Sequence, residues 1–263
     1  TGLVVSLSYS QSLFISEYIE GSSNNKALEI YNPTGSTVNL AGYELWRIAN
    51  GGDWDEGEGN AVDLSGYGSI SAGDVFVICN SSIAEEYSAA CDVSGTDITY
   101  YNGDDAIGLA HNGTLIDAIG EAGDDPGTGW AVAGVENATK EHTLIRKLTV
   151  NGGNINWASS AGTTTGNSEW IVFNQDTFDY LGSHGDLPEI EGCMDPAAAN
   201  YDPNATIDCG DCCDYGDEVS IYDIQYANQP GDGTFDCYPS PYGVFGEEQY
   251  VTTTGVITAI KPG

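Results

Sequence analysis

The sequence predicts an all-β protein whose main domain is a sandwich or a barrel of short strands. Short segments of alternating apolar and polar residues recur along residues 13–185, and a period of two is typical of strands that bury one face. Asn-Gly pairs at 50–51, 102–103, 112–113 and 151–152 supply turn signals between these segments. The chain also contains 35 Gly and 9 Pro and few strong helix formers, which favours strands and turns over helices.

The expected strands follow one another in a regular order. One of them has Leu28 and Ile30 on one face and Glu29 and Tyr31 on the other. Residues 74–79 are instead a nearly continuous apolar run, which is typical of a central sandwich strand. The full set of expected strands is 27–31, 43–48, 74–79, 106–110, 115–119, 143–150 and 169–173.

One hairpin and one helix complete this expected secondary structure. His111–Thr114 places Asn-Gly between two short apolar strands, which is the strongest hairpin signal in the chain. Only residues 82–89 have a helical pattern.

Composition divides the chain into four parts. Residues 1–12 are either the remnant of a signal peptide or a first strand, and residues 13–185 form the sandwich. Residues 186–218 hold 10 acidic residues and no basic residue, so this part is either a linker stabilised by disulfides and ions or disordered. Strand patterns resume at 219–263, but they are too few to close a sheet. We therefore expect the chain to be a fragment of a longer polypeptide.

The charge of the chain excludes some partners. It has 40 acidic and 6 basic residues, a formal net charge of −34. Such a surface repels phosphates, so residues 1–185 are not expected to bind nucleic acid directly without divalent cations. The same field attracts divalent cations and basic partners, although high acidity also simply keeps a secreted protein soluble. No segment approaches the roughly 20 apolar residues of a membrane span.

Seven cysteines indicate an oxidising compartment. Cys79 and Cys91 flank one loop, and we expect a disulfide between them. Zinc is the alternative for the remaining cysteines, but one CxxC pair without a second pair or a nearby histidine makes disulfides the better interpretation. Seven is an odd number, so one thiol is free or pairs elsewhere, and the connectivity within the C-terminal group stays open. That group is Cys193, Cys209, Cys212, Cys213 and Cys237.

No residue is predicted to be catalytic. His111, His142 and His184 fall in or beside expected turns, where a histidine is usually exposed, and no nucleophile elbow accompanies them. The acid pair Asp104-Asp105 is better explained by turn capping, with its first aspartate on turn amides, than by general acid catalysis. The glycine-rich segment 120–130 lacks the lysine and the helix of a phosphate-binding loop.

Oxygen side chains in the acidic part predict a calcium site. Asp202, Asn204 and Asp208 recur at even spacing, which lets one loop surround a hard cation, and Asp195 lies nearby. The candidate cofactor is thus a structural Ca²⁺, with no organic cofactor expected. A solvated acidic linker remains the alternative. The candidate ligands are Asp195, Asp202, Asn204 and Asp208.

Several short motifs resemble, in order, the bacterial lamin-tail domain over about 13–184. They are Ile15–Gly21, Ala27–Pro33, Val38–Tyr43, Ile70–Val77, Asn102–Leu109, Gly113–Gly120 and Thr143–Lys147. The resemblance implies an immunoglobulin-like β-sandwich that accompanies nucleases, other hydrolases and surface proteins in secreted bacterial proteins. It offers no catalytic residue.

Two shorter resemblances concern the rest of the chain. Gly192–Asp208 is similar to Cys/Asp-rich repeats of secreted Bacteroidetes proteins, and 219–263 looks like the start of the OB-like domain of secreted bacterial nucleases. We therefore expect a non-catalytic binding or spacing module, with an unknown extracellular ligand, in a secreted or cell-surface bacterial protein. The intact polypeptide would be an extracellular nuclease or related hydrolase; the alternative is a surface adhesin or structural module with no enzyme attached.

Overall fold

The computed structural model describes residues 12–54 and 61–185, together with 187, 191–193, 198–202, 205, 207–209 and 211–214. The chain divides into two compact units, Thr1–Pro188 and Glu189–Gly263. Residues 1–11 and the OB-like segment expected at 219–263 lie outside the described residues. Within the described part of the chain, no helix is long and apolar enough to cross a membrane.

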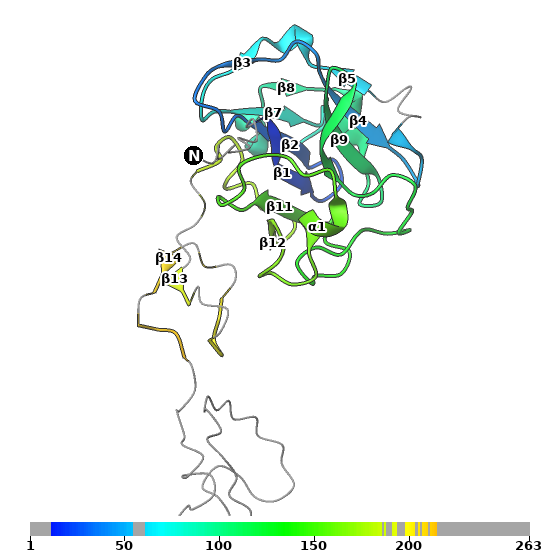
Figure 1. Cartoon of the computed structure of the whole chain (residues 1–263). Coiled ribbons are helices and arrows are strands. Elements are labelled where there is room, and N and C mark those ends of the chain that lie inside the picture. Colours follow the sequence, from blue (N-terminus) through cyan, green and yellow to red (C-terminus); the bar gives the residue numbers. More distant parts are fainter. Residues whose placement is uncertain are drawn as a thin grey trace, which may run out of the picture. The chain divides into compact units, whose positions relative to one another are not determined.

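The larger sheet of the first unit has six strands (Figure 1). They are β1 (Phe14–Glu20), β2 (Lys26–Tyr31), β7 (Val75–Cys79), β8 (Val93–Ser94), β11 (His142–Arg146) and β12 (Trp170–Phe173). Their spatial order is β12-β11-β1-β2-β7-β8, and all neighbours are antiparallel except β7 and β8. Because β1 pairs with both β2 and β11, the sheet joins the beginning of the unit to its end.

A four-stranded antiparallel sheet forms the second layer. Its strands are β4 (Tyr43–Ile48), β5 (Ala61–Asp63), β9 (Ala106–His111) and β10 (Thr114–Ile119), in the spatial order β10-β9-β4-β5. Short elements complete the first unit. They are β3 (Val38–Asn39), β6 (Ser69–Ile70), the 3₁₀ helices η2 (Ser65–Tyr67), η3 (Glu85–Ala90) and η4 (Asp97–Tyr100), and α1 (Trp157–Ala161).

The hydrophobic core lies between the two sheets. Leu28 and Ile30 of β2 are fully buried and belong to one cluster with Leu45 of β4 and with Ile107 and Leu109 of β9. Each strand thus contributes alternate residues to the space between the layers, as in a sandwich. The predicted all-β sandwich is confirmed, with sheets consistent with an immunoglobulin-like fold.

The outer face of the six-stranded sheet is buried as well. Residues 174–185, which we call the cover segment, follow β12 and lie over this face. Phe178 and Leu181 of the cover segment pack against Ile19, Val77 and Cys79, which point away from the main core. All seven residues of β1 are therefore buried, although the strand contains two glutamates.

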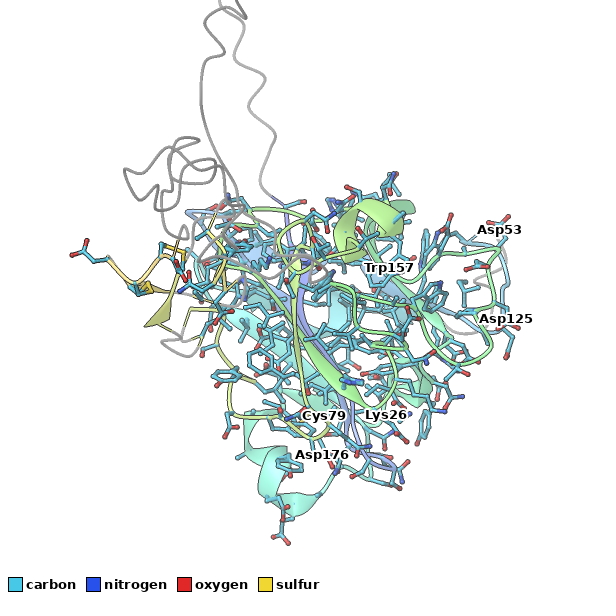
Figure 2. The ribbon with its side chains drawn as sticks, turned by 90° about the horizontal axis from the view of Figure 1, so that it is seen from below. Lys26, Asp53, Cys79, Asp125, Trp157 and Asp176 are labelled. Carbon is cyan, nitrogen blue, oxygen red and sulfur yellow. A yellow bond between two sulfur atoms is a disulfide. The ribbon has the colours of Figure 1, made fainter. Side chains whose placement is uncertain are left out.

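Polar contacts hold the cover segment at two points. The Thr143 hydroxyl donates to the Thr177 carbonyl at 3.0 Å. The carboxylate of Asp176, labelled in Figure 2, accepts hydrogen bonds from the backbone N–H and hydroxyl of Ser22 at 2.9 and 2.6 Å. These contacts tie the segment to the turn after β1 and to β11.

Cys79 and Cys91 form a disulfide, with their Cα atoms 5.8 Å apart. The bond ties the loop that carries η3 to the end of β7, beside the cover segment. In the chain-entropy model, closing this loop stabilises the folded state by about 3 kcal/mol, because it restricts the unfolded chain.

Two local expectations need correction. The strand expected at 143–150 ends at Arg146, because Lys147–Val150 forms a turn in which the Val150 N–H donates to the Lys147 carbonyl at 2.9 Å. The helix expected at 82–89 is the 3₁₀ helix η3, shifted to Glu85–Ala90. The hairpin at His111–Thr114 is present, and Asn112 and Gly113 have φ values of 51° and 71°. Positive φ at both positions is the requirement that makes Asn-Gly favourable there.

The second unit contains two further disulfides, Cys193–Cys213 and Cys209–Cys212. Its strands β13 (Glu191–Gly192) and β14 (Ile207–Asp208) pair in parallel. Four of the five C-terminal cysteines are thus paired, and Cys237 lies outside the described residues.

Candidate functional site

The predicted calcium ligands are only partly described. Asp195 and Asn204 lie outside the described residues, and so does the side chain of Asp208. Asp202 is described, and its backbone N–H donates to the Cys193 carbonyl at 2.8 Å. Among the residues that the structure describes, no group of three or more His, Cys, Asp or Glu side chains could hold a metal ion. The calcium site therefore stays a prediction.

The three turn histidines have structural contacts, and one is buried. The ring of His111 stacks on Tyr43 with centroids 4.2 Å apart. His184 is only 8 % exposed and lies between the rings of Phe14 and Tyr31, at 5.6 and 4.6 Å. The expectation that turn histidines are exposed is wrong for His184, because the cover segment packs it on the outer face. Burial lowers its pKa to about 4, so the ring is neutral at physiological pH.

The acid pair Asp104-Asp105 serves a turn, as predicted, but the roles of its two residues are reversed. In Asp104-Asp105 the second residue is the one engaged, since the Asp105 carboxylate accepts from the Asn102 N–H at 3.0 Å. Asp105 also pairs with Arg47 at 3.3 Å. Asp105 is 3 % exposed, whereas Asp104 is only partly buried.

The most extensive buried polar site was not predicted, and it begins with Asp117. A bulge in β10 shifts the register between Leu115 and Asp117, so that Asp117 lies opposite Leu109. Leu109 faces the core, and the extra residue of the bulge turns Asp117 to the same side. Its carboxylate is completely buried.

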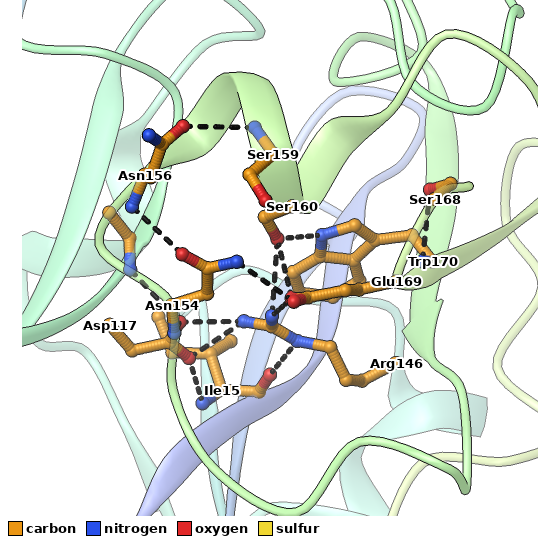
Figure 3. Close-up of polar contacts among 11 residues, drawn as sticks. Ile15, Asp117, Arg146, Asn154, Asn156, Ser159, Ser160, Ser168, Glu169 and Trp170 are labelled. Carbon is orange, nitrogen blue, oxygen red and sulfur yellow. Dashed lines mark hydrogen bonds and ion pairs between the residues drawn. The ribbon is translucent and has the colours of Figure 1, made fainter.

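Arg146 of β11 approaches Asp117 from the other sheet (Figure 3). Its Nη2 donates to both carboxylate oxygens at 2.7 and 2.8 Å. Ile15 of β1 engages both partners: its N–H donates to Asp117 at 2.8 Å, and its carbonyl accepts from Arg146 Nε at 3.3 Å. The pair therefore joins β10 of one sheet to β1 and β11 of the other.

The other end of the guanidinium group is held by α1 and by β12. Its Nη1 donates to the Ser160 hydroxyl at 3.1 Å and to the Glu169 carboxylate. The same hydroxyl accepts from Trp170 Nε1 at 2.9 Å, and the centroid of the Trp170 ring lies 4.0 Å from the guanidinium carbon. Asn156 caps α1 with its side chain, which places Ser160 in this position.

Asn154 closes the network on the loop side. Its backbone N–H donates to Asp117 at 2.8 Å and its side chain donates to Glu169 at 2.8 Å. Burial raises the pKa of the Asp117 carboxyl group, while the Arg146 charge and the N–H groups of Asn154 and Ile15 act in the opposite direction. Both charged partners are thus occupied by fixed donors and acceptors, and the arrangement stabilises the contact between the sheets.

A second pair of buried carboxyl groups lies beneath the cover segment. Glu17 and Glu29 are directly opposite each other on β1 and β2, and both are 1 % exposed. Glu29 accepts from the Ser16 hydroxyl at 2.7 Å and from the Gly182 N–H of the cover segment at 2.8 Å. Oε1 of Glu17 has no hydrogen-bond partner within the described part of the chain. Burial raises the pKa of Glu29 to about 7 and raises the pKa of Glu17 well above its usual value.

Replacing Arg146 with Met should strongly destabilise the first unit. The substitution leaves Asp117 buried without its counter-ion, which costs about 3–5 kcal/mol of unfolding free energy. Urea denaturation followed by tryptophan fluorescence measures this loss. Lys140→Met, which removes an exposed cation, is the control and should change stability by less than about 0.5 kcal/mol. Equal effects of the two substitutions would contradict a structural role for Arg146.

Glu29 should make the protein less stable as the pH rises from about 5 to 8. Its folded pKa is raised above the unfolded value, so its contribution is fully present below the unfolded pKa and is lost as the pH passes through about 7. Replacing Glu29 with Gln removes this titration. The amide oxygen can still accept from the Gly182 N–H, and the amide NH₂ can donate to the Ser16 hydroxyl. As the pH rises from 5 to 8, the wild type should therefore lose up to about 3 kcal/mol of unfolding free energy that the variant retains. Urea denaturation at both values measures it, with Glu136→Gln as the exposed control; parallel profiles for wild type and Glu29→Gln would exclude this effect.

Comparisons with known proteins give one family match. No curated protein matches the chain. A crystal structure of a DUF4876 family protein from Bacteroides thetaiotaomicron is similar over 64 % of this chain and 69 % of that chain, with 12 % identity and a TM-score of 0.36. The matched family segment ends before β11 and β12, which the structure nevertheless places in the same sheet as β1. Residues 7–123 match the family model described as the lamin tail domain.

Proposed function

We propose that the chain is a non-catalytic binding or spacing module of a secreted or cell-surface multi-domain bacterial protein, and that this protein is an extracellular nuclease or a related hydrolase. The observation that carries the proposal is the use of the buried polar groups. Asp117 and Glu169 both pair with Arg146, and Asp117 also accepts from the Ile15 N–H of the other sheet. They stabilise a rigid domain, which is what a module that binds or spaces requires.

Three further observations support this function. Residues 7–123 match the lamin tail domain, a module type. The three disulfides of the described residues favour an extracellular or otherwise oxidising environment. A net charge of −34 repels nucleic acid from the module itself, so substrate recognition in an attached nuclease would belong to another domain.

The purified chain should show no hydrolysis of DNA, RNA or a phosphodiester model substrate, with Ca²⁺ or Mg²⁺ present. Release of acid-soluble nucleotides and of the chromogenic leaving group measures this. Activity that disappears on substituting one residue of this chain would contradict the proposal. The full sequence of the gene then distinguishes the parent proteins, since His/Asp/Asn metal-binding motifs outside residues 1–263 support the nuclease and a gene without them supports the adhesin.

We also propose that the acidic part of the chain binds a structural Ca²⁺ through Asp195, Asp202, Asn204 and Asp208. Two carboxylates 4 Å apart repel each other by about 4 kcal/mol at an effective dielectric constant near 20. A shared divalent cation converts this repulsion into attraction. The disulfide Cys193–Cys213 supports the proposal, because it joins two parts of this segment that are 20 residues apart.

Calcium should protect residues 186–218 from proteolysis, and chelation should remove the protection. Mg²⁺ should protect less, because it requires a tighter octahedral geometry and loses water reluctantly. Mass spectrometry of limited digests locates the cuts, and calorimetric titration measures binding. Asp202→Asn together with Asp208→Asn should abolish the effect, whereas Glu136→Gln, at an exposed position of the first unit, should not. Equal cleavage in all conditions, without heat at millimolar Ca²⁺, would leave only the solvated linker.

A further inference from the structure

The outer face of the four-stranded sheet carries two neighbouring tryptophans. Trp46 follows the core-facing Leu45 on β4, so its side chain points to the outer face. The ring of Trp54 lies beside it, with centroids 6.5 Å apart and a tilt of 42°. Both side chains are partly exposed. They form a partly exposed aromatic surface on this side of the sheet, and Trp54 also packs against the main core cluster.

A glycine on the neighbouring strand allows this arrangement. Gly108 of β9 lies opposite Trp46. A Cβ atom at Gly108 would lie 2.9 Å from the Trp54 ring and 2.6 Å from Cδ1 of Leu115. Any larger residue would displace Trp54 from the sheet, so the close packing of the ring depends on the missing side chain.

Two carboxylates accompany the tryptophans on the same face. Glu44 precedes Trp46 by two residues, and its Oε2 accepts from Trp46 Nε1 at 2.9 Å. Asp63 of β5 lies directly opposite Glu44 and is fixed by the N–H and hydroxyl of Ser65 at 2.8 and 2.9 Å. The Ser65 hydrogen bonds lower the pKa of Asp63, which keeps it charged.

Within the part of the chain that the structure describes, no ion pair neutralises these two negative charges. Like charges directly opposite each other on a sheet repel. The ion pairs of the described residues involve Lys26, Arg47 and Arg146, and their acidic partners do not include Glu44 or Asp63. The face therefore offers two oriented carboxylates next to an aromatic pair, within a chain of net charge −34.

We propose that this face, formed by Glu44, Trp46, Trp54 and Asp63, binds arginine side chains of a basic partner polypeptide. A guanidinium group stacks on an indole ring and presents a planar fork of donors to a carboxylate. A lysine ammonium lacks the plane and the fork. The field of the acidic protein draws a polycationic partner towards this face. The inference deepens the proposed binding role and rests on it.

Charge complementarity selects this occupant over a neutral one. A neutral sugar ring also stacks on tryptophan, but it leaves Glu44 and Asp63 facing each other without compensation. An arginine side chain satisfies the aromatic surface and the carboxylates together.

The test measures the binding of hexa-arginine and hexa-lysine peptides to the whole chain by calorimetry and tryptophan fluorescence. The salt concentration is about 0.15 M, because at this ionic strength the electrostatic field of the distant acidic residues is screened beyond about 8 Å. Hexa-arginine should bind at least about fivefold more tightly than hexa-lysine, because only the guanidinium group has a plane that stacks on the indole ring and two parallel N–H donors for one carboxylate. Glu44→Gln and Trp46→Ala should each weaken hexa-arginine binding about tenfold. Glu136→Gln removes one charge from an exposed loop and should change binding less than about twofold.

Thermal unfolding checks that each variant is folded, and Trp46→Phe, which keeps an aromatic ring, replaces Trp46→Ala if the latter unfolds. Equal binding of the two peptides, or equal effects of Glu44→Gln and Glu136→Gln, would overturn the inference, and so would preferential binding of a neutral oligosaccharide. Failure here leaves the proposed module role intact, because that role fails only if the chain itself hydrolyses substrate.

Discussion

The ion pair between Asp117 and Arg146 is the interaction on which the arrangement of the two sheets depends. Asp117 belongs to the four-stranded sheet and Arg146 to the six-stranded sheet, and both side chains are completely buried. Neither charge can remain in the core without the other, because an unpaired buried charge is strongly destabilising. The bulge in β10, the position of β1 and the cap of α1 all serve to place donors and acceptors around this pair.

The same constraint explains how the six-stranded sheet is buried on both faces. Arg146 fixes β11 against β1, and β12 extends from it into the cover segment. The cover segment then places the Gly182 N–H on Glu29 and the ring of His184 on Phe14. One face of the sheet is thus held by a charged pair and the other by apolar packing over carboxyl groups whose pKa values are raised. The two sheets are coupled through β1 of the six-stranded sheet, because the backbone of its Ile15 contacts both Asp117 and Arg146.

The sequence predicted what depends on local pattern. Alternation located the strands around Leu28, and the Asn-Gly pair at 112–113 located the hairpin, because period and turn chemistry are properties of neighbouring residues. Alternation also placed Glu29 on the face away from Leu28, which is correct. It could not show that the cover segment, about 150 residues later, buries that face. For the same reason the burial of His184 could not be foreseen.

The central site depended on contacts that no local pattern reveals. Asp117 and Arg146 are 29 residues apart, and their encounter requires both the bulge and the packing of two sheets. One signal was present in the sequence: each is a charged residue beside apolar residues in an expected strand, 115–119 and 143–150. Such residues are almost never fully buried unless they are paired. Glu29, Glu44 and Arg47 are also charged residues within expected strands, so this signal marks candidates for a buried pair but does not select Arg146 as the partner of Asp117.

A double-mutant cycle on Asp117→Asn and Arg146→Met tests the central claim most directly. The cycle compares the unfolding free energies of the wild type, the two single variants and the double variant in urea. If the pair joins the two sheets, the double variant should be much more stable than the sum of the single effects requires, with a coupling free energy of about 2 kcal/mol or more. A coupling of about 0.5 kcal/mol or less, the value for independent sites, would show that the two residues act separately and would contradict the account.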